Sequence, residues 1–260
     1  MASIPQQRIV QKLDDYMSRR DYAGAERHLL YWLAEALEIG DRRGELMVRN
    51  ELIGHFRKVG NREQALANIE AALLLIDELE FQNTMSAGTT YTNAATALNA
   101  FGENERSLAL FDKAAALYEG MSGISPHLLS GLSNNRALAC VALGRFDEAD
   151  ALYEKALAVL RDAGHGELEQ AITCLNMADA AVARTADACG GDDAVALQDE
   201  ACEKAVESLL DTALELLDAP SVQHDGYYAF VCEKCAPVFA HYGYFLTAAD
   251  LRERAEAIYG

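Results

Sequence analysis

The sequence predicts an all-α fold, a solenoid of about six stacked helix pairs, and two observations support this prediction. First, a glycine recurs at a constant spacing of 42 residues, at Gly60, Gly102 and Gly144, and a small residue follows each glycine five positions later. A self-similar period of this length is typical of stacked helix pairs. Second, only 4 Pro and 18 Gly interrupt the 260 residues, and no alternating strand pattern is present. Such arrays have an extended concave face, so we expect binding there before any catalytic pocket.

The recurring step accounts for each helix pair in turn. Glycine ends the first helix of a pair because the next backbone position needs a positive φ, and polar residues beyond it begin the second helix. The first pair shows this step less perfectly, at Ala23-Gly24-Ala25, and the last pair shows it at Gly243. The small residues at positions 65, 107 and 149 should let the two helices of a pair approach closely. The pattern predicts twelve helices, at residues 5–18, 22–39, 42–58, 62–79, 84–101, 104–119, 126–143, 146–162, 166–186, 194–217, 224–242 and 246–258.

The fifth helix pair is expected to be irregular. Gly144 and Gly243 lie 99 residues apart, which is too far for two regular repeats. We place an insertion near 187–193, a polar, glycine-containing link between two long helices.

The charge of the chain limits its partners. The formal net charge is −19, which argues against duplex nucleic acid or an anionic membrane, because phosphates attract Lys and Arg. Residues 1–62 hold 11 Lys and Arg against 9 Asp and Glu, so the acidic excess lies beyond them. The densest acidic segment, residues 187–218, is interpreted as a solvated helix face, with a basic partner as the alternative.

Location and redox state are also predicted from composition. Residues 1–8 lack the apolar core of a secretory signal, and the longest strongly apolar run, residues 71–76, is too short to span a bilayer. Six cysteines in 260 residues are too sparse for a disulfide-stapled scaffold. We therefore expect a cytoplasmic protein with reduced thiols.

One stretch resembles a known family. Residues 134–157 read NNRALACVALGRFDEADALYEKAL, which resembles a tetratricopeptide repeat of the 42-residue kind found in kinesin light chains. The resemblance covers nearly the whole chain and is strongest in repeats two to four, although the Trp common early in such repeats is missing. It implies a right-handed superhelix, one domain over residues 1–260, whose first helices line an inner groove. In this family that groove usually holds an extended peptide or a partner's helix.

Asparagines in register supply the candidate binding residues. Asn93 and Asn135 lie 42 residues apart, and Asn176 follows 41 residues later; by the resemblance this position points into the groove. Asn inside a helix costs roughly 0.5 kcal/mol or more relative to Ala, so three in register suggest a positional reason. A carboxamide both donates to and accepts from an extended peptide backbone. The alternative is that each Asn bonds to the neighbouring helix and locks the stack.

The second repeat adds candidates that would select at one end of the groove. Its register position is Glu51, flanked by Asn50, with Arg57 one or two turns later. This end could receive a peptide carboxylate or acidic side chains. Alternatively, Arg57 simply complements the end of its helix.

Catalytic and metal chemistry find little support. Cys232 and Cys235 form a CxxC, but no second ligand pair accompanies it, so two buried or half-buried thiols are expected. No phosphate loop or nucleophile elbow is present, and we expect no enzyme, cofactor or metal.

We interpret the chain as a protein-interaction module that binds an extended peptide or partner segment in the concave groove. The alternatives are a structural scaffold or oligomerisation module, and a peptide-sensing regulator. Aromatic residues crowd the last repeat, so a homodimer through the C-terminal repeat is also a hypothesis.

Overall fold

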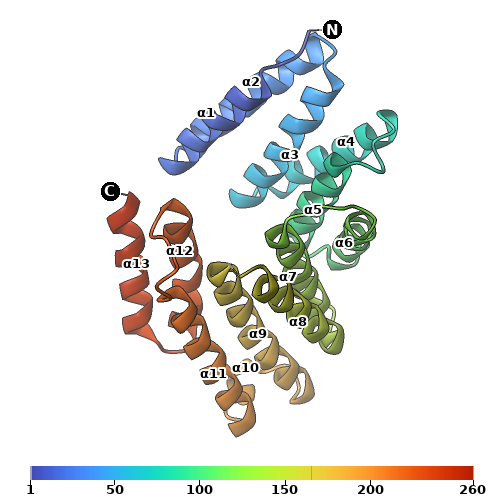
Figure 1. Cartoon of the computed structure of the whole chain (residues 1–260). Helices are drawn as coiled ribbons and strands as arrows, with labels where there is room; N and C mark the ends of the chain where they lie inside the picture. The colour runs from blue at the N-terminus through green and yellow to red at the C-terminus, as the bar shows by residue number, and fades with distance from the viewer. Residues whose placement is uncertain (1, 165, 260) are drawn as a thin grey trace. The chain divides into compact units, whose positions relative to one another are not determined.

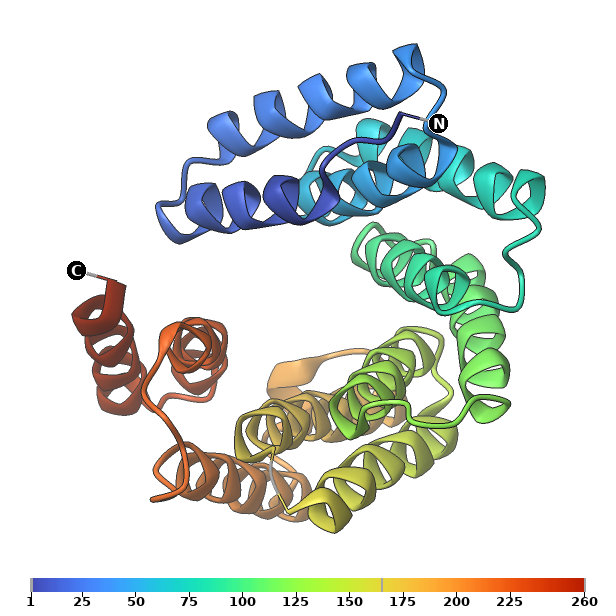
Figure 2. The same cartoon turned by 45° about the horizontal axis from the view of Figure 1, so that its top comes forward.

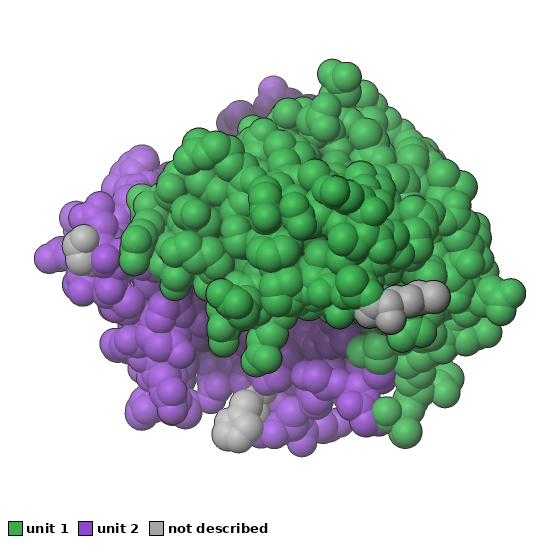
Figure 3. Space-filling view, turned by 90° about the horizontal axis from the view of Figure 1, so that it is seen from above, with its two compact units in different colours: residues 1–122 green, residues 123–260 purple. Residues whose placement is uncertain are grey.

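The structure is a computed structural model that describes residues 2–164 and 166–259. Within these ranges it contains thirteen helices and no strand (Figure 1). The contacts divide the chain into two compact units, residues 1–122 and 123–260 (Figure 3). The all-α prediction is confirmed, whereas the single domain over residues 1–260 stays a prediction.

Unit 1 contains three helix pairs, and their boundaries lie within one residue of those predicted from the glycine spacing. Its helices are α1 (Gln6–Ser18), α2 (Tyr22–Glu38), α3 (Arg42–Lys58), α4 (Arg62–Glu78), α5 (Met85–Ala100) and α6 (Asn104–Glu119).

Unit 2 contains the remaining three pairs and one additional short helix. Its helices are α7 (Pro126–Ala142), α8 (Phe146–Ala163), α9 (Glu167–Ala188), α10 (Asp193–Ala196), α11 (Glu200–Leu217), α12 (Gly226–His241) and α13 (Phe245–Tyr259).

Local chemistry sets the turn inside each pair. Gly60 and its counterparts in later repeats adopt the left-handed conformation, with φ 74° at Gly60, which an L side chain rarely tolerates. In the first pair Arg20 takes this place with φ 54°, which explains why the step looks imperfect in the sequence. The next helix then begins on a cap: the Asn61 side chain accepts from the Gln64 N–H, as Asp21 does from Gly24.

Small residues hold the helices of each pair together, as predicted. Ala65, Ser107 and Ala149 are fully buried, and the Ser107 hydroxyl donates to the Ala95 carbonyl across the pair. Large side chains one turn later fill the space that remains. Phe111 in unit 1 and Tyr153 in unit 2, 42 residues apart, are both fully buried.

The first helices of successive pairs also contact one another within each unit. In unit 1, α3 contacts α5; in unit 2, α9 contacts both α7 and α12 (Figure 2). Each unit therefore has a layer of first helices backed by a layer of second helices, which is the arrangement of a repeat solenoid.

The insertion differs from the prediction in two respects. The helix expected over 194–217 is broken, because α10 ends at Ala196 and α11 begins at Glu200. Asp199 causes the restart, since its side chain accepts from the N–H groups of Ala201 and Cys202. The preceding helix α9 also continues past the predicted end at residue 186, so the link begins at Cys189.

None of the helices in the described ranges is both long enough and apolar enough to cross a membrane.

Candidate binding surfaces on the first helices

A groove in unit 1 brings together three of the six predicted binding residues. It lies along α3 and α5, has a volume of about 530 Å³, and is lined by Asn50, Glu51 and Asn93 among others. Its apolar floor includes Leu46 and Met47 from α3. We call this the α3–α5 groove. Its volume falls within the range of ligand pockets, roughly 300–1,000 Å³.

The Asn50 side chain makes its hydrogen bonds within the protein. Its amide nitrogen donates to the Leu46 carbonyl at 3.0 Å and to the Thr90 hydroxyl on α5 at 2.9 Å. Its amide oxygen is buried and has no hydrogen-bond partner among the described residues. Asn50 thus links α3 to α5, while one acceptor at the groove remains unsatisfied.

Glu51 and Asn93 differ from Asn50 because neither side chain makes a hydrogen bond or ion pair within the described part of the chain. Glu51 is half-buried, and its burial, followed by the charge of Asp14, raises the pKa of its carboxyl. An unpaired carboxylate in such a place is unfavourable until a cation or donor reaches it. Asn93 offers a complete carboxamide on the opposite wall.

Arg43 is a groove residue that the sequence analysis missed. Its guanidinium lies over the Phe81 ring, 5.2 Å from the centroid, and both residues line the groove with Met85. A stacked guanidinium keeps its donors available while its flat face is held. Arg43 lies two turns before Glu51 on α3, and this helical spacing was the available signal.

Arg57 is on α3 but does not line the α3–α5 groove. Desolvation lowers the pKa of its guanidinium. Arg57 lies six residues beyond Glu51, near the end of the helix, where a cation also complements the helix dipole.

The register asparagines of unit 2 are arranged differently. The Asn176 amide nitrogen donates to the Asn134 amide oxygen at 3.1 Å, which joins α9 to α7. Asn135, the predicted register residue, has no hydrogen-bond partner for its side chain among the described residues. The structural pairing therefore follows the 42-residue spacing of Asn134 and Asn176.

The same spacing produces a second contact between first helices in unit 2. A ring nitrogen of His127 on α7 lies 3.0 Å from the Glu169 carboxylate on α9, and the Tyr227 hydroxyl on α12 donates to the same oxygen at 3.1 Å. His127 and Glu169 are 42 residues apart. Glu169 thus links three successive first helices, although only its contact with His127 follows the repeat period, since Tyr227 lies 58 residues away.

The two cysteines of the CxxC are buried, as the sequence predicted. Burial raises the pKa of the Cys235 thiol to about 12 and raises that of Cys232 as well, so both stay protonated at neutral pH. Across the described residues, no three His, Cys, Asp or Glu side chains converge so as to hold a metal ion.

Comparison with solved structures identifies the architecture. BtubC (BKLC) from P. vanneervenii superposes with a TM-score of 0.63 at 18% identity, covering 84% of this chain and 82% of that chain. The fold is that of tetratricopeptide repeats. The tetratricopeptide-like repeats of a kinesin light chain from Podosopora anserina also match, with a TM-score of 0.51 at 18% identity, covering 82% and 93% of the two chains. Their Q17M variant gives a TM-score of 0.52.

At these identities the likeness to tetratricopeptide-repeat proteins concerns the fold. No protein-family model matches the chain, and no curated protein matches its sequence. The predicted resemblance to repeats of the kinesin-light-chain type is nevertheless confirmed at the level of structure. Tetratricopeptide repeats generally serve as protein-interaction scaffolds.

Proposed function

We propose that this protein is a non-enzymatic interaction module and that the α3–α5 groove binds an extended segment of a protein partner. The observation that carries the proposal is the set of uncommitted polar groups on an apolar floor. Glu51 and Asn93 have no intramolecular partner in the described chain, and Arg43 is held on Phe81 with its donors available.

The spacing of these groups suggests how a segment would lie. Arg43 and Glu51 are eight residues apart on one helix, or about 12 Å at a rise of about 1.5 Å per residue. An extended chain covers this distance in about four residues at roughly 3.3 Å each. We therefore propose a segment with an acidic group near Arg43 and a basic group near Glu51, whose backbone bonds to Asn93.

The remaining predicted residues have secondary roles in this proposal. Asn176 bonds to a neighbouring helix, as the alternative of an internal asparagine ladder expects at this position, and Asn50 also bonds to a neighbouring helix, although it was a candidate for selection at the end of the groove. Asn135 remains a candidate for backbone binding in unit 2, and Arg57 remains a candidate for selection. A cytoplasmic location is part of the proposal, because six free thiols suit a reducing compartment.

Self-association through the C-terminal repeat is a second candidate function. Phe245 and Leu246, at the start of α13, are 70% and 88% exposed, which is unusual for adjacent large apolar residues. Light scattering at high concentration, with wild type and a Leu246→Ser variant, would test it. A wild-type monomer would contradict it.

The groove is tested with peptides selected from a random display library on the full chain. Affinities of the selected peptides are then measured for wild type, Asn93→Ala and the control Asn99→Ala, which makes the same change on the same helix outside the groove. We expect Asn93→Ala to weaken binding about two- to tenfold, the cost of one or two hydrogen bonds. Asn99→Ala should leave it unchanged. If wild type and both variants bind the selected peptides with equal affinity, the scaffold alternative is favoured over peptide binding in the groove.

A further inference from the structure

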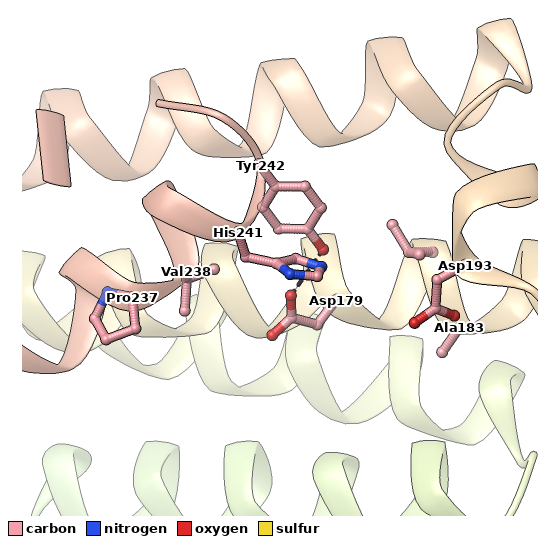
Figure 4. A pocket seen from close by; sticks show the side chains of 8 residues that line it. Asp179, Ala183, Asp193, Pro237, Val238, His241 and Tyr242 are labelled. Carbon is pink, nitrogen blue, oxygen red and sulfur yellow. Dashed lines mark hydrogen bonds between the residues drawn. The ribbon is translucent and has the colours of Figure 1, made fainter. Parts of the chain in front are cut away.

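A cavity in unit 2, separate from the α3–α5 groove, combines an apolar wall with carboxylates. Its volume is about 380 Å³, and its wall is formed by Val182 and Ala183 of α9 with Pro237 and Val238 of α12. Its polar edge contains Asp179, Asp193, His241 and Tyr242, so we call it the α9–α12 cavity. Figure 4 shows these side chains around the cavity, with His241 and Tyr242 beside Asp179.

One carboxylate is held in place by the protein. The Tyr242 hydroxyl donates to Oδ1 of Asp179 at 2.7 Å, and the His241 ring packs edge-on against Tyr242 with centroids 4.9 Å apart. Asp179 is exposed at the surface, yet the surrounding protein raises the pKa of its carboxyl; the hydrogen bond from Tyr242 and the nearby His241 lower this pKa, and the charge of Asp193 raises it. Asp179 is thus oriented at some cost to its ionised form.

The second carboxylate comes from the insertion. Asp193 is the first residue of the short helix α10, which the irregular fifth repeat adds beside α9. No hydrogen bond or ion pair of its side chain exists within the described residues. The charges of Asp179 and Asp193 repel each other, and in the part of the chain that the structure describes neither carboxylate has a Lys or Arg partner.

We propose that the α9–α12 cavity binds a basic side chain, Arg or Lys, presented by a protein partner. The aliphatic stem of such a side chain covers an apolar wall while its charged head reaches carboxylates at the edge. Val182, Ala183, Pro237 and Val238 supply the wall, and Asp179 and Asp193 supply the acceptors. The match is to a side chain that is apolar along its length and cationic at its end.

The charge of the surrounding unit supports this choice of partner. Residues 123–260 carry 23 Asp and Glu against 9 Lys and Arg, a net charge of −14. A field of this sign attracts basic segments and repels acidic ones. This inference does not depend on the α3–α5 groove, because every lining residue of the cavity belongs to unit 2.

The test uses amides of N-acetyl-arginine and N-acetyl-citrulline, titrated into the ¹⁵N-labelled full chain at low salt. Citrulline has the same shape without the charge. We expect the arginine probe alone to shift the amide signals of Ala183, Val238 and Tyr242. Equal shifts with both probes, or shifts located elsewhere in the chain, would overturn the proposal.

Variants separate the site from general attraction to an acidic protein. The double variant Asp179→Asn, Asp193→Asn should weaken arginine binding at least fivefold. The control double variant Asp162→Asn, Asp211→Asn removes the same charge at exposed positions outside the cavity and should leave the binding unchanged. Asp193→Asn alone, which removes no intramolecular bond, should also weaken it. If both double variants lose the same amount of arginine affinity, the binding depends only on net charge, and the proposed site is wrong.

A last measurement distinguishes a basic side chain of a protein from a free small-molecule cation. If a protein presents the side chain, the N-acetyl-arginine amide, or a short peptide containing arginine, should bind at least as tightly as agmatine, a small molecule with one amine and one guanidine group. Tighter binding of agmatine would assign the cavity to a small molecule and overturn the protein partner.

Discussion

Units 1 and 2 are built from the same helix pairs, yet they present different chemistry on their first helices. Unit 1 carries 13 Lys and Arg against 18 Asp and Glu, a net charge of −5, compared with −14 for unit 2. Its repeats are regular, and its groove mixes Arg43 with Glu51. In unit 2 an insertion brings Asp193 beside a cavity that already contains Asp179.

The difference between the two units shows what regular repeats and an interrupted repeat each contribute to the surface of the first helices. Where repeats are regular, side chains at the repeat period meet across neighbouring helices, as Asn134 and Asn176 do. Where the repeat is interrupted, residues outside the period enter a site, as α10 does with Asp193. The strongest prediction therefore compares matched positions in the two units.

The largest expected effect comes from the matched core residues Phe111 and Tyr153. Both are fully buried, so replacing either by Ala should lower the free energy of unfolding by about 3–5 kcal/mol. Trp32, the single tryptophan, lies in unit 1. In denaturant titrations, Phe111→Ala should shift the Trp32 fluorescence transition more than Tyr153→Ala does.

Circular dichroism of the same samples provides the control, because it reports helices of both units. If the two variants shift the fluorescence and dichroism transitions equally, the chain unfolds as one block. That result would favour the single domain predicted from the sequence over two separately unfolding units.

A smaller effect should separate asparagines that hold helices together from those that are uncommitted. Asn50→Ala removes hydrogen bonds to Leu46 and Thr90 and should cost about 1–2 kcal/mol of stability. Asn93→Ala removes no intramolecular bond and should stay within about 0.5 kcal/mol. Thermal unfolding of both variants measures the contrast, and an equal loss would show that Asn93 has a structural role.

The smallest expected effect concerns the charge of Glu51. Burial raises the pKa of this carboxyl in the folded protein, so the folded state binds the proton more tightly than the unfolded state does. The associated stability is present at low pH and is lost as pH rises through the folded pKa. Glu51→Gln should therefore raise the melting temperature at pH 7 by about 1–2 °C and leave it unchanged at pH 3.5.

A melting temperature that falls at pH 7 in this variant would contradict the assignment of Glu51 as an unpaired carboxylate. Glu63→Gln, at an exposed position on α4, is the control for a change of one charge.

Most of the fold was predictable because it depends on local chemistry. Glycines at positive φ, caps such as Asp21 and Asn61, and fully buried small residues such as Ala65 mark the helix boundaries directly in the sequence. The break at 197–199 was missed because the apolar periodicity continues through it. Only the cap formed by Asp199 reveals that a new helix begins there.

The candidate sites were predictable only in part. The sequence alone identified the helix layer and placed Glu51 and Asn93 in one register, with Asn50 beside Glu51, because the period of the repeat fixes which residues share a face. It did not determine which of these side chains is already bonded, since Thr90 reaches Asn50 only when α3 and α5 are packed. Likewise, α9, α10 and α12 must fold together before Asp179, Asp193 and Tyr242 line one cavity. Local periodicity determined the helices and their faces, whereas tertiary packing decided which polar groups remain available to a partner.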